Sequence, residues 1–319
     1  MLRDGELQQT RNGAAWVAPA PVMTVYERPW ERVLFCPKRD ANPFFHLFES
    51  VWMLGGRNDV KSVDRYVKQM KAYSDDGKTF HAAYGHRWRV HFGKDQVRAV
   101  AKALAVNPRC RRQVIAMWDA RADDSSNGGL DLPCNTHTYA WIDVQDRLSL
   151  TVCCRSNDMI WGAYGANAVH FSFLQQALAE ATGRRMGKLY QLSNNFHAYE
   201  AVFNKLGDIS DNVDPYFVEK STIEPGATPE HSVNLLSAES SNADGLCGLQ
   251  QLFEDIGKLL DEGMIQGLRS PFLRTTVVPM IKAHDAYKAK NGHALEIVEQ
   301  VACPDWRRAG REWLQRRAK

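Results

Sequence analysis

Pro133-Cys134-Asn135 and, further on, Leu148–Cys154 with the adjoining Arg155-Ser156-Asn157-Asp158 decide how this chain is interpreted. These segments combine a candidate nucleophilic thiol, an apolar run that predicts a strand, and an arginine at the end of that run. A cysteine attacks well only as a thiolate, and a nearby guanidinium stabilises that charge. Arginine also binds phosphate or carboxylate groups through its forked donors. The pattern therefore predicts an enzyme.

Size and composition are those of an ordinary soluble protein. The 319 residues suffice for one large domain or two modest ones, and 44% hydrophobic with 24% charged residues is typical of globular chains. The amino terminus is charged and lacks an apolar core, so we expect no signal peptide. Since no run of about 18 apolar residues occurs, we expect no membrane partner.

Cysteine usage points to a reducing cytoplasm and to no bound metal. The chain has seven cysteines, an odd number without paired spacing, and no Cys-x-x-Cys motif. Cys153 and Cys154 are adjacent in a predicted strand, so their side chains face opposite sides and are a poor chelate. We therefore expect a cytoplasmic protein without zinc or another metal.

Positive charge is concentrated at the carboxyl terminus. The whole chain carries a net charge of +3, whereas residues 306–319 alone carry five arginines and one lysine against one glutamate. Such a segment contacts nucleic acid or acidic partners in some proteins and is simply a solvated helix end in others. The solvated helix end is the favoured interpretation, and nucleic acid is not an expected partner.

Hydrophobic periodicity predicts an α+β fold. Helices are expected at residues 43–55, 59–73, 98–105, 169–182, 249–262, 272–289, 295–302 and 305–316. Strands are expected at residues 112–118, 140–144, 147–154 and 189–199, with a turn at 145–146. Polar residues from about 207 to 244 indicate exposed connections. We expect a catalytic core over 1–205, and the rest of the core with a helical carboxyl-terminal extension over 206–319.

Seven short motifs follow one another in the order and approximate spacing of a known family. They are Arg11-Asn12-Gly13, Glu49-Ser-Val-Trp52-Met-Leu54-Gly-Gly56, Tyr84-Gly85-His-Arg-Trp88-Arg89, Arg111-Arg112, Pro133-Cys134, Arg155-Ser156-Asn157-Asp158 and His197-Ala198-Tyr199. On these residues the chain resembles the thymidylate synthase family over most of residues 11–199. The residues beyond 199 show no such match.

The resemblance implies a thymidylate synthase-like mixed sheet packed with helices, and a folate-dependent reaction. Carbon 5 of a pyrimidine is a poor nucleophile until a group adds at carbon 6. Addition of the Cys134 thiolate at carbon 6 makes carbon 5 enolate-like, so that it attacks a one-carbon unit. The resemblance names 5,10-methylenetetrahydrofolate as the co-substrate and a pyrimidine deoxynucleoside monophosphate as the acceptor.

The resemblance also assigns the residues that bind the nucleotide phosphate. Arg11, Arg155 and Ser156 would hold it within one subunit. Arg111 and Arg112 would reach it from the other subunit of a homodimer. A phosphate dianion is well served by several forked donors, which explains a site with four arginines.

Other roles implied by the resemblance concern the sugar, the base and folate. His197 and Tyr199 would hydrogen-bond to the 3′-hydroxyl of the sugar. Glu49 would order water for proton transfer at the base, and Tyr84 would help to remove the carbon 5 proton. Asp158 would contact the pterin ring of folate, and Trp52 is a second expected folate contact.

Each of these residues also has a structural interpretation. A lone buried cysteine such as Cys134 is usually a small core residue, and Tyr84 is of a type often found in cores. Arg111-Arg112 could simply flank a strand. Glu49 is harder to explain in this way, because an unpaired carboxylate in an otherwise apolar helix is costly.

Two departures from the family concern how the base is recognised. The base-reading asparagine is expected eight residues after Asp158, where the chain has Ala166, so we assign this role to Asn167 and infer a one-residue insertion. An asparagine amide can donate to O4 and accept from N3–H of uracil, although a flipped amide would also suit cytosine. The family usually has histidine after its cysteine. This chain has Asn135, and whether Asn135 or His137 takes over that role stays open.

Further departures favour a hydroxymethyl product. Met70 and Tyr73 stand where reductive members carry shielding tryptophans, and the family's short apolar carboxyl terminus is not apparent. A wetter site lets water add to the exocyclic methylene and leaves tetrahydrofolate unoxidised. We therefore expect a dUMP hydroxymethylase, of the kind bacteriophages use to make modified DNA bases. The alternatives are thymidylate synthase, deoxycytidylate hydroxymethyltransferase and, without catalysis, a nucleotide- or nucleic-acid-binding relative.

Overall fold

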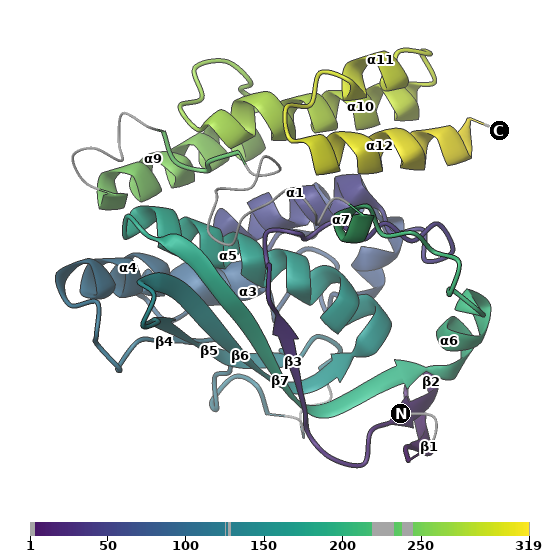
Figure 1. Cartoon of the computed structure of the whole chain (residues 1–319), viewed down its shortest axis with the longest axis horizontal. Helices are drawn as coiled ribbons and strands as arrows, with labels where there is room; N and C mark the ends of the chain where they lie inside the picture. The colour runs from purple at the N-terminus through teal and green to yellow at the C-terminus, as the bar shows by residue number, and fades with distance from the viewer. Residues whose placement is uncertain (1–3, 125, 127–128, 219–232, 238–244, 319) are drawn as a thin grey trace.

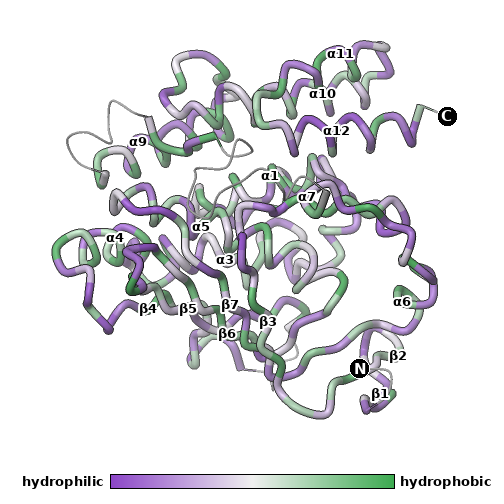
Figure 2. The backbone as a smooth tube through the Cα atoms, in the orientation of Figure 1, coloured by the Kyte–Doolittle hydropathy of each residue, from purple (hydrophilic) through white to green (hydrophobic). Residues whose placement is uncertain are grey.

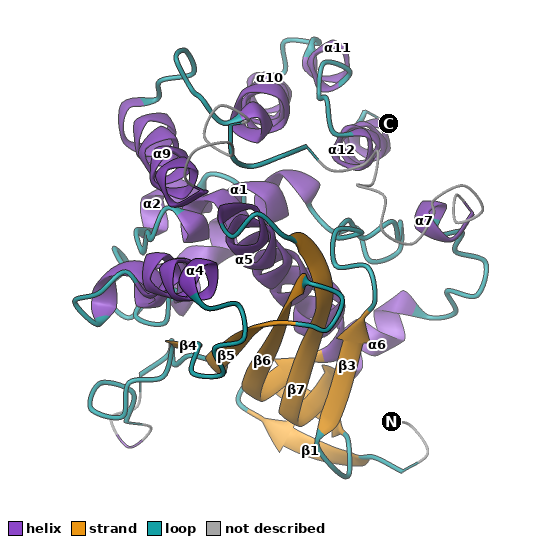
Figure 3. Ribbon diagram, turned by 60° about the vertical axis from the view of Figure 1, so that its left-hand side comes forward, coloured by secondary structure: helices purple, strands orange, loops and turns teal. Residues whose placement is uncertain are grey.

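Three layers make up the fold in the computed structural model, which describes residues 4–124, 126, 129–218, 233–237 and 245–318. A mixed β-sheet forms the first layer, helices α1 (Pro43–Leu54) and α5 (Asn167–Ala181) form the second, and carboxyl-terminal helices form the third. Figures 1 and 3 show α1 and α5 between the sheet and the last helices of the chain. The α+β class predicted from the sequence is confirmed.

The sheet has seven described strands in the order β1-β2-β7-β6-β5-β4, with β3 paired to β7. Their bounds are β1 Glu6–Thr10, β2 Gly13–Val17, β3 Val22–Tyr26, β4 Val114–Ala116, β5 Asn135–Ile142, β6 Arg147–Asp158 and β7 Arg185–Tyr199. Strands β6 and β7 are parallel, and the other pairs are antiparallel. A parallel pair needs a crossover, which α5 supplies. The ends of β6 and β7 therefore lie side by side.

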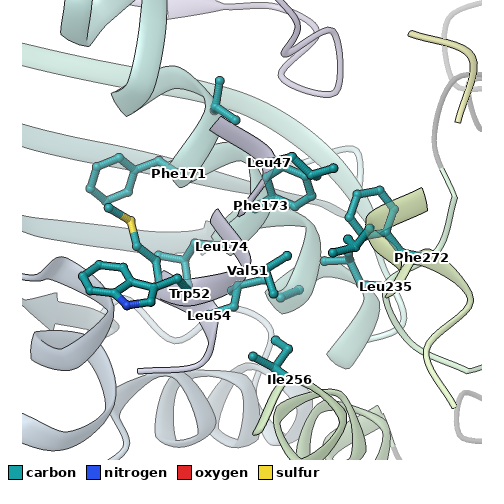
Figure 4. Close-up of a cluster of buried hydrophobic side chains, with 14 of the residues drawn as sticks. Leu47, Val51, Trp52, Leu54, Phe171, Phe173, Leu174, Leu235, Ile256 and Phe272 are labelled. Carbon is teal, nitrogen blue, oxygen red and sulfur yellow. The ribbon is translucent and has the colours of Figure 1, made fainter. Parts of the chain in front are cut away.

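Helix α1 lies at the centre of the hydrophobic core. Asn42 caps its amino terminus by accepting from the Phe45 backbone N–H, and eleven of its twelve residues are buried. Because α1 is buried on nearly all sides, its sequence is mostly apolar around the whole helix and does not form a separate polar face. Figure 4 shows Val51 and Leu54 of α1 and Phe173 and Leu174 of α5 in one cluster with Ile256 and Phe272 of the carboxyl-terminal region.

The remaining helices and helical turns connect these layers or cover them. They are α2 Val60–Asp64, η1 Lys68–Tyr73, α3 Tyr84–His86, η2 Arg87–His91, α4 Gln96–Val106, η4 Met159–Ala166, α6 Glu200–Leu206, α7 Pro215–Val218, α9 Gly245–Gly257, η6 Lys258–Glu262, η7 Leu273–Val277, α10 Val278–Ala289, α11 Ala294–Val298 and α12 Pro304–Arg317. The predicted single helix over 59–73 is wrong: α2 ends at Asp64 and a separate 3₁₀ turn, η1, follows.

The basic helix α12 packs against α1 rather than standing in solvent. Its Trp306 and Trp313 are buried, and the Trp313 ring meets Phe44 of α1 edge-on at 5.3 Å. Figure 2 shows α12 as mainly hydrophilic, because its outer face carries the arginines. Arg316 and Arg317 form ion pairs with Asp40. Part of the predicted polar connection over 207–244 lies outside the described residues, namely 219–232 and 238–244.

The sheet face opposite α1 and α5 carries exposed apolar side chains. Its cross-strand neighbours run from β4 to β3 as Val114, Tyr139, Thr151, Tyr190 and Val25. Exposed members of this face are Met23, Val25, Val114, Tyr139, Trp141 and Leu192. A contiguous apolar surface on a folded protein is typical of an interaction site.

Candidate active site

Cys134 lies immediately before β5, and the side chain of Arg155 on β6 reaches it. Arg155 Nη2 is 3.8 Å from Cys134 Sγ. The guanidinium is held in place because Nε donates to the Pro133 carbonyl at 2.8 Å and Nη2 donates to the Leu132 carbonyl at 3.0 Å. The structure thus brings together the thiol and the arginine that the sequence pairs.

Burial and charge oppose each other at the Cys134 thiol. Burial raises the pKa of Cys134 above its usual value, Arg155 and Arg11 act to lower it, and Asp131 acts to raise it. Desolvation disfavours the thiolate, whereas a nearby cation favours it. A bound anion such as a phosphate near these arginines would change this balance.

The Tyr84 hydroxyl lies against the backbone of the candidate nucleophile. It accepts hydrogen bonds from the backbone N–H groups of Cys134 at 3.2 Å and of Asn135 at 3.3 Å. Burial, followed by the Cys134 charge, raises the pKa of Tyr84, so its hydroxyl stays protonated. Gly85 allows this placement: a Cβ there would lie 2.0 Å from the Met53 carbonyl oxygen of α1.

The turn between β1 and β2 brings Arg11 to the same region. Arg11 Nη2 donates to the Leu130 carbonyl at 3.2 Å, and Asn12 Nδ2 donates to the Tyr199 hydroxyl at 3.2 Å. Gly13 has a φ of 110°, a conformation that favours glycine in this tight turn. The Arg-x-Gly and His-x-Tyr motifs, far apart in the sequence, therefore meet.

Parallel pairing of β6 and β7 places the sugar-binding candidates beside the phosphate-binding candidates. Ser156 is the cross-strand partner of Asn195, and Asp158 is the partner of His197. His197 Nδ1 is 2.9 Å from Asn195 Oδ1, and the His197 and Tyr199 rings meet edge-on at 5.3 Å. Four residues of two predicted motifs, Ser156, Asp158, His197 and Tyr199, thus lie together at the ends of β6 and β7.

Glu49 has a buried partner that the sequence did not reveal. Glu49 Oε2 is 2.9 Å from Nε2 of His170 on α5, and both side chains are nearly inaccessible. A third residue, His46, lies close by, and burial followed by the charge of His170 lowers the pKa of His46 to about 3. A carboxylate beside an imidazole can hold or transfer a proton at this position. The spacing of the sequence gives no sign of this contact, because it forms only when α5 packs against α1.

Asp158 combines a structural bond with an unused oxygen. Its Oδ1 caps η4 by accepting from the Ile160 and Trp161 backbone N–H groups at 2.8 and 2.5 Å. Its Oδ2 is buried without a partner among the described residues. Arg39 stacks over the Trp161 ring at 3.6 Å, and Asp158 acts to raise the pKa of Arg39, which burial lowers. A spare carboxylate oxygen beside a half-exposed tryptophan fits the N–H groups and flat ring of a pterin.

Asn167 lies between two other asparagine side chains that the sequence did not connect to it. Asn135 Nδ2 donates to Asn167 Oδ1 at 3.1 Å, and Asn167 Nδ2 donates to Asn157 Oδ1 at 3.0 Å. Asn135 and Asn157 are almost completely buried. Asn167 therefore starts α5 with an amide whose two ends both have partners.

A β-bulge in β5 separates Asn135 from His137. Asn135 pairs with Cys154 and His137 pairs with Cys153, so Thr136 is an extra residue between them. The bulge turns Asn135 toward the core, whereas His137 contacts the Tyr139 hydroxyl at 2.9 Å on the outer face. Asn135 and His137 therefore lie on different faces of the sheet, and Asn135 is the residue that reaches Asn167.

Three predicted site residues lie away from this cluster within one subunit. Arg111 and Arg112 are exposed just before β4. Trp52 is only 2% exposed, and its indole N–H donates to Asp59 Oδ1 at 3.3 Å. Burial in the core leaves the Trp52 ring without surface for folate, which differs from the contact expected.

The described parts of the chain contain neither a cluster of metal-binding side chains nor a membrane-spanning helix. No group of three His, Cys, Asp or Glu side chains there is arranged to hold a metal ion. Among the same residues, every helix is too short or too polar to traverse a lipid bilayer.

Comparison with known proteins identifies a family and several similar chains. The thymidylate synthase family model matches residues 22–218. A deoxyuridylate hydroxymethyltransferase of Pseudomonas phage M6 is 46% identical over 98% of this chain and 88% of its own length. The deoxyuridylate hydroxymethyltransferase of Bacillus phage SP01 is 35% identical over 56% of this chain and 49% of its own length. A putative thymidylate synthase of Methanothermobacter marburgensis is 32% identical over 48% of this chain and 65% of its own length.

Proposed function

The chain belongs to the thymidylate synthase family, and on this premise we propose that it transfers a one-carbon unit to carbon 5 of dUMP and releases 5-hydroxymethyl-dUMP. The observation that carries the proposal is the 3.8 Å approach of Arg155 Nη2 to Cys134 Sγ, where the charge of Arg11 also acts to lower the pKa of the thiol. A thiolate stabilised by arginines that also attract a phosphate suits attack on a nucleotide base.

The proposed roles of the chain's own residues follow from their positions. Cys134 attacks carbon 6 of the base. Arg11, Arg155 and Ser156 bind the phosphate, and His197 with Tyr199 holds the 3′-hydroxyl. 5,10-Methylenetetrahydrofolate supplies the one-carbon unit at the oxidation level of formaldehyde.

Proton transfer and base recognition fall to a second group of side chains. Tyr84, whose hydroxyl touches the backbone of Cys134, assists removal of the carbon 5 proton. Glu49, beside His170, orders the water that exchanges protons with the base. Asn167 reads the base, and the free Oδ2 of Asp158 accepts from the pterin ring.

Two observations favour a hydroxymethyl product on uracil. The relative from Pseudomonas phage M6, similar along nearly the whole chain, is a deoxyuridylate hydroxymethyltransferase. The region expected to shield the methylene group contains Met70, half-buried against the core, and Tyr73, which is 52% exposed. Neither residue offers the broad apolar cover of a tryptophan, so water would reach the methylene carbon.

We further propose a cytoplasmic homodimer formed through the open face of the sheet. The exposed apolar side chains of β3, β4, β5 and β7 lie on that face, and burying them against a second copy would remove a large apolar surface from water. Arg111 and Arg112, exposed at the edge of the same sheet, would then reach the partner's phosphate site. Seven free thiols suit a reducing cytoplasm, whether of a cell or of a phage-infected host.

The test is incubation with dUMP or dCMP and methylenetetrahydrofolate, followed by mass measurement of the nucleotide product. A 5-hydroxymethyl-dUMP product supports the proposal. Growth of dihydrofolate absorbance with a 5-methyl product would instead establish thymidylate synthase, and a product from dCMP alone would establish the deoxycytidylate enzyme. A covalent adduct of Cys134 with 5-fluoro-dUMP separates all three enzymes from a binding protein without catalysis.

A further inference from the structure

Asn167 and four neighbouring side chains form a connected set of hydrogen bonds, here named the amide ring. The Cys154 thiol donates to Asn135 Oδ1 at 2.8 Å, and Asn135 Nδ2 donates to Asn167 Oδ1 at 3.1 Å. Asn167 Nδ2 donates to Asn157 Oδ1, and Asn157 Nδ2 donates to Ser193 Oγ, both at 3.0 Å. Ser193 is the cross-strand neighbour of Cys154, where the set begins, and it acts to lower the pKa of the Cys154 thiol. Each residue in this set donates to the next, so all four hydrogen bonds run in one direction, from Cys154 to Ser193.

Sheet geometry and one glycine hold the amide ring together. Asn135, Cys154 and Ser193 are cross-strand neighbours on β5, β6 and β7. Gly162 makes room for the bond from Asn167 to Asn157, because a Cβ there would lie 2.4 Å from Asn157 Oδ1 and 3.0 Å from Asn167 Nδ2. The backbone of the fold therefore sets the positions of the side chains in the amide ring.

The direction of the amide ring decides how the Asn167 amide faces. Its two ends cannot exchange places unless Asn135 and Asn157 turn as well, because each end is paired with one of them. Each end also keeps one unused valence: a lone pair on Oδ1 and an N–H on Nδ2. Uracil offers an N3–H donor beside the O4 acceptor, whereas cytosine offers the N3 acceptor beside an N4 amino donor. One ring direction suits uracil, and the reverse direction suits cytosine.

We propose that the amide ring sets the choice between uracil and cytosine, with Asn135 and Asn157 as positioning residues that hold Asn167 in the uracil-reading orientation. This inference rests on the proposed function, in which Asn167 reads the base. Hydrogen bonds that run in one direction around a buried ring reinforce one another, so the ring holds or reverses as a unit.

Two features fix the observed direction while leaving the reverse direction accessible to a variant. Burial raises the pKa of Cys154 to about 12, so its thiol keeps the proton that it donates to Asn135 Oδ1. Gln191 Oε1 accepts a second bond from Asn157 Nδ2 at 3.0 Å, and Gln191 Nε2 has no partner among the described residues. If Asn157 turned its oxygen toward Gln191, the Gln191 amide could turn and donate.

Two isosteric substitutions should move base choice in opposite directions. In Asn135→Asp the carboxylate can only accept hydrogen bonds. Asn167 must therefore turn its Nδ2 toward residue 135, which reverses the Asn167 amide and favours dCMP. In Asn157→Asp the carboxylate accepts from Asn167 Nδ2 as before, which keeps the uracil-reading direction. We expect Asn135→Asp to lower the ratio of kcat/KM for dUMP to that for dCMP by about tenfold or more. Asn157→Asp should keep or raise that ratio.

The ratio is the right measure because each new carboxylate also affects the overall rate. A negative charge at residue 135 lies next to Cys134 and disfavours its thiolate, which slows both substrates alike. Asn107→Asp at the end of α4, where Asn107 Oδ1 accepts from the Arg109 backbone N–H, is the matched control and should leave the ratio unchanged. Circular dichroism verifies that each variant is folded.

Equilibrium binding of dUMP and dCMP, measured by calorimetry on the same proteins, separates failure of this inference from failure of the proposed function. If the parent protein modifies neither nucleotide, the proposed function fails, and the ratio of dissociation constants still tests the amide ring. A lower dUMP-to-dCMP ratio in Asn135→Asp, together with an unchanged or higher ratio in Asn157→Asp, supports the inference. Shifts in the same direction, shifts of reversed sign, or no shift in either variant would overturn it.

Discussion

The Arg155 guanidinium lies 3.8 Å from the Cys134 sulfur while its Nε and Nη2 atoms are bound to the carbonyls of Pro133 and Leu132. These two carbonyl bonds fix the arginine at the base of the loop that carries the thiol. The guanidinium is thus positioned before any nucleotide binds, so little conformational freedom is lost when a phosphate arrives.

Replacement of Cys134 by alanine should abolish turnover without abolishing nucleotide binding. The phosphate and sugar contacts come from other residues, whereas bond formation at carbon 6 requires the thiolate. We expect activity to fall by about a thousandfold or more, with the dissociation constant for dUMP changing little in calorimetry. Cys153→Ala, a change at the neighbouring thiol that pairs with His137, is the control. Normal turnover by Cys134→Ala would disprove the nucleophile assignment.

The reactivity of Cys134 should depend on pH in a way that reports on Arg155. Burial raises the pKa of Cys134, and Arg155 opposes that rise. The thiolate fraction increases with pH, and with Arg155 present this increase occurs at a lower pH than without it. In Arg155→Gln the pH profile of alkylation by iodoacetamide should move to higher pH, and in Arg155→Lys it should move less. Mass spectrometry of the Cys134 peptide resolves this thiol from the other six. Superimposable profiles would show that the guanidinium does not act on the sulfur.

Replacement of Asn167 by aspartate should shift preference from dUMP toward dCMP. A carboxylate accepts from the N4 amino group of cytosine and repels the O4 atom of uracil. It accepts from Asn135 as Asn167 does, and from Asn157 once that amide turns, so the buried partners remain satisfied. We expect the ratio of kcat/KM for dUMP to that for dCMP to fall by about tenfold or more. An unchanged ratio would show that another residue reads the base, and the inferred one-residue insertion would then be wrong.

Mixed dimers should reveal whether Arg112 acts across the subunit interface. Cys134→Ala and Arg112→Ala proteins should each be nearly inactive alone. In a mixed dimer, one site carries both changes and the other carries neither, provided that Arg112 is donated by the partner. Random mixing of equal amounts should then restore about a quarter of the parent activity. If mixing restores nothing while sedimentation shows that mixed dimers form, Arg112 acts within its own subunit or not at all.

Replacement of Gly85 by alanine should destabilise the fold more than most single substitutions do. The added Cβ would lie 2.0 Å from the Met53 carbonyl oxygen, and backbone cannot move aside as a flexible side chain can. We expect a loss of about 3 kcal/mol or more in the free energy of unfolding measured by urea denaturation. Gly257→Ala is the matched control, because no atom lies within 4 Å of its added Cβ. That helical position should gain stability by about 0.5–1 kcal/mol.

Much of the fold could be predicted because burial follows periodicity. Helices α1 and α5 and strand β6 have apolar patterns that match their buried faces, and the structure places all three near their predicted bounds. Residues 59–73 show the limit of this reasoning. No side chain of η1 is fully buried, and Met70 is only half-buried against the core, so too little packing is available to sustain a longer helix.

Strands held mainly by pairing were missed. Strand β1, Glu6–Thr10, is exposed along its whole length and exists because it pairs with β2. Strand β5 begins at Asn135, earlier than predicted, because its first residues are polar yet bonded inside the core. Strand β4 ends early, since the backbone N–H groups of both Met117 and Trp118 donate to the Thr136 carbonyl.

The residues of the candidate site that belong to the recognised motifs could be predicted from the sequence. Contacts between side chains outside these motif roles could not, because they form only when the chain folds. The structure brings Cys134, Tyr84 and Arg155 together as the motifs imply. It also places His170 against Glu49, and Asn157 against Asn167, and neither contact leaves a mark in the spacing of the sequence. Asn157 occupies the variable position of the Arg-Ser-x-Asp motif, which is why sequence comparison within the motif passes over it.

The bulge at Thr136 has a practical consequence for anyone who wishes to move this chemistry into another scaffold. A transplanted strand with regular alternation would keep its thiol, yet it would turn the following amide outward and leave the Cys154 thiol without its acceptor. The Cys134 thiol and the bulged backbone that follows it therefore have to be transferred together. A design that copies side chains alone would inherit the sulfur and lose its surroundings.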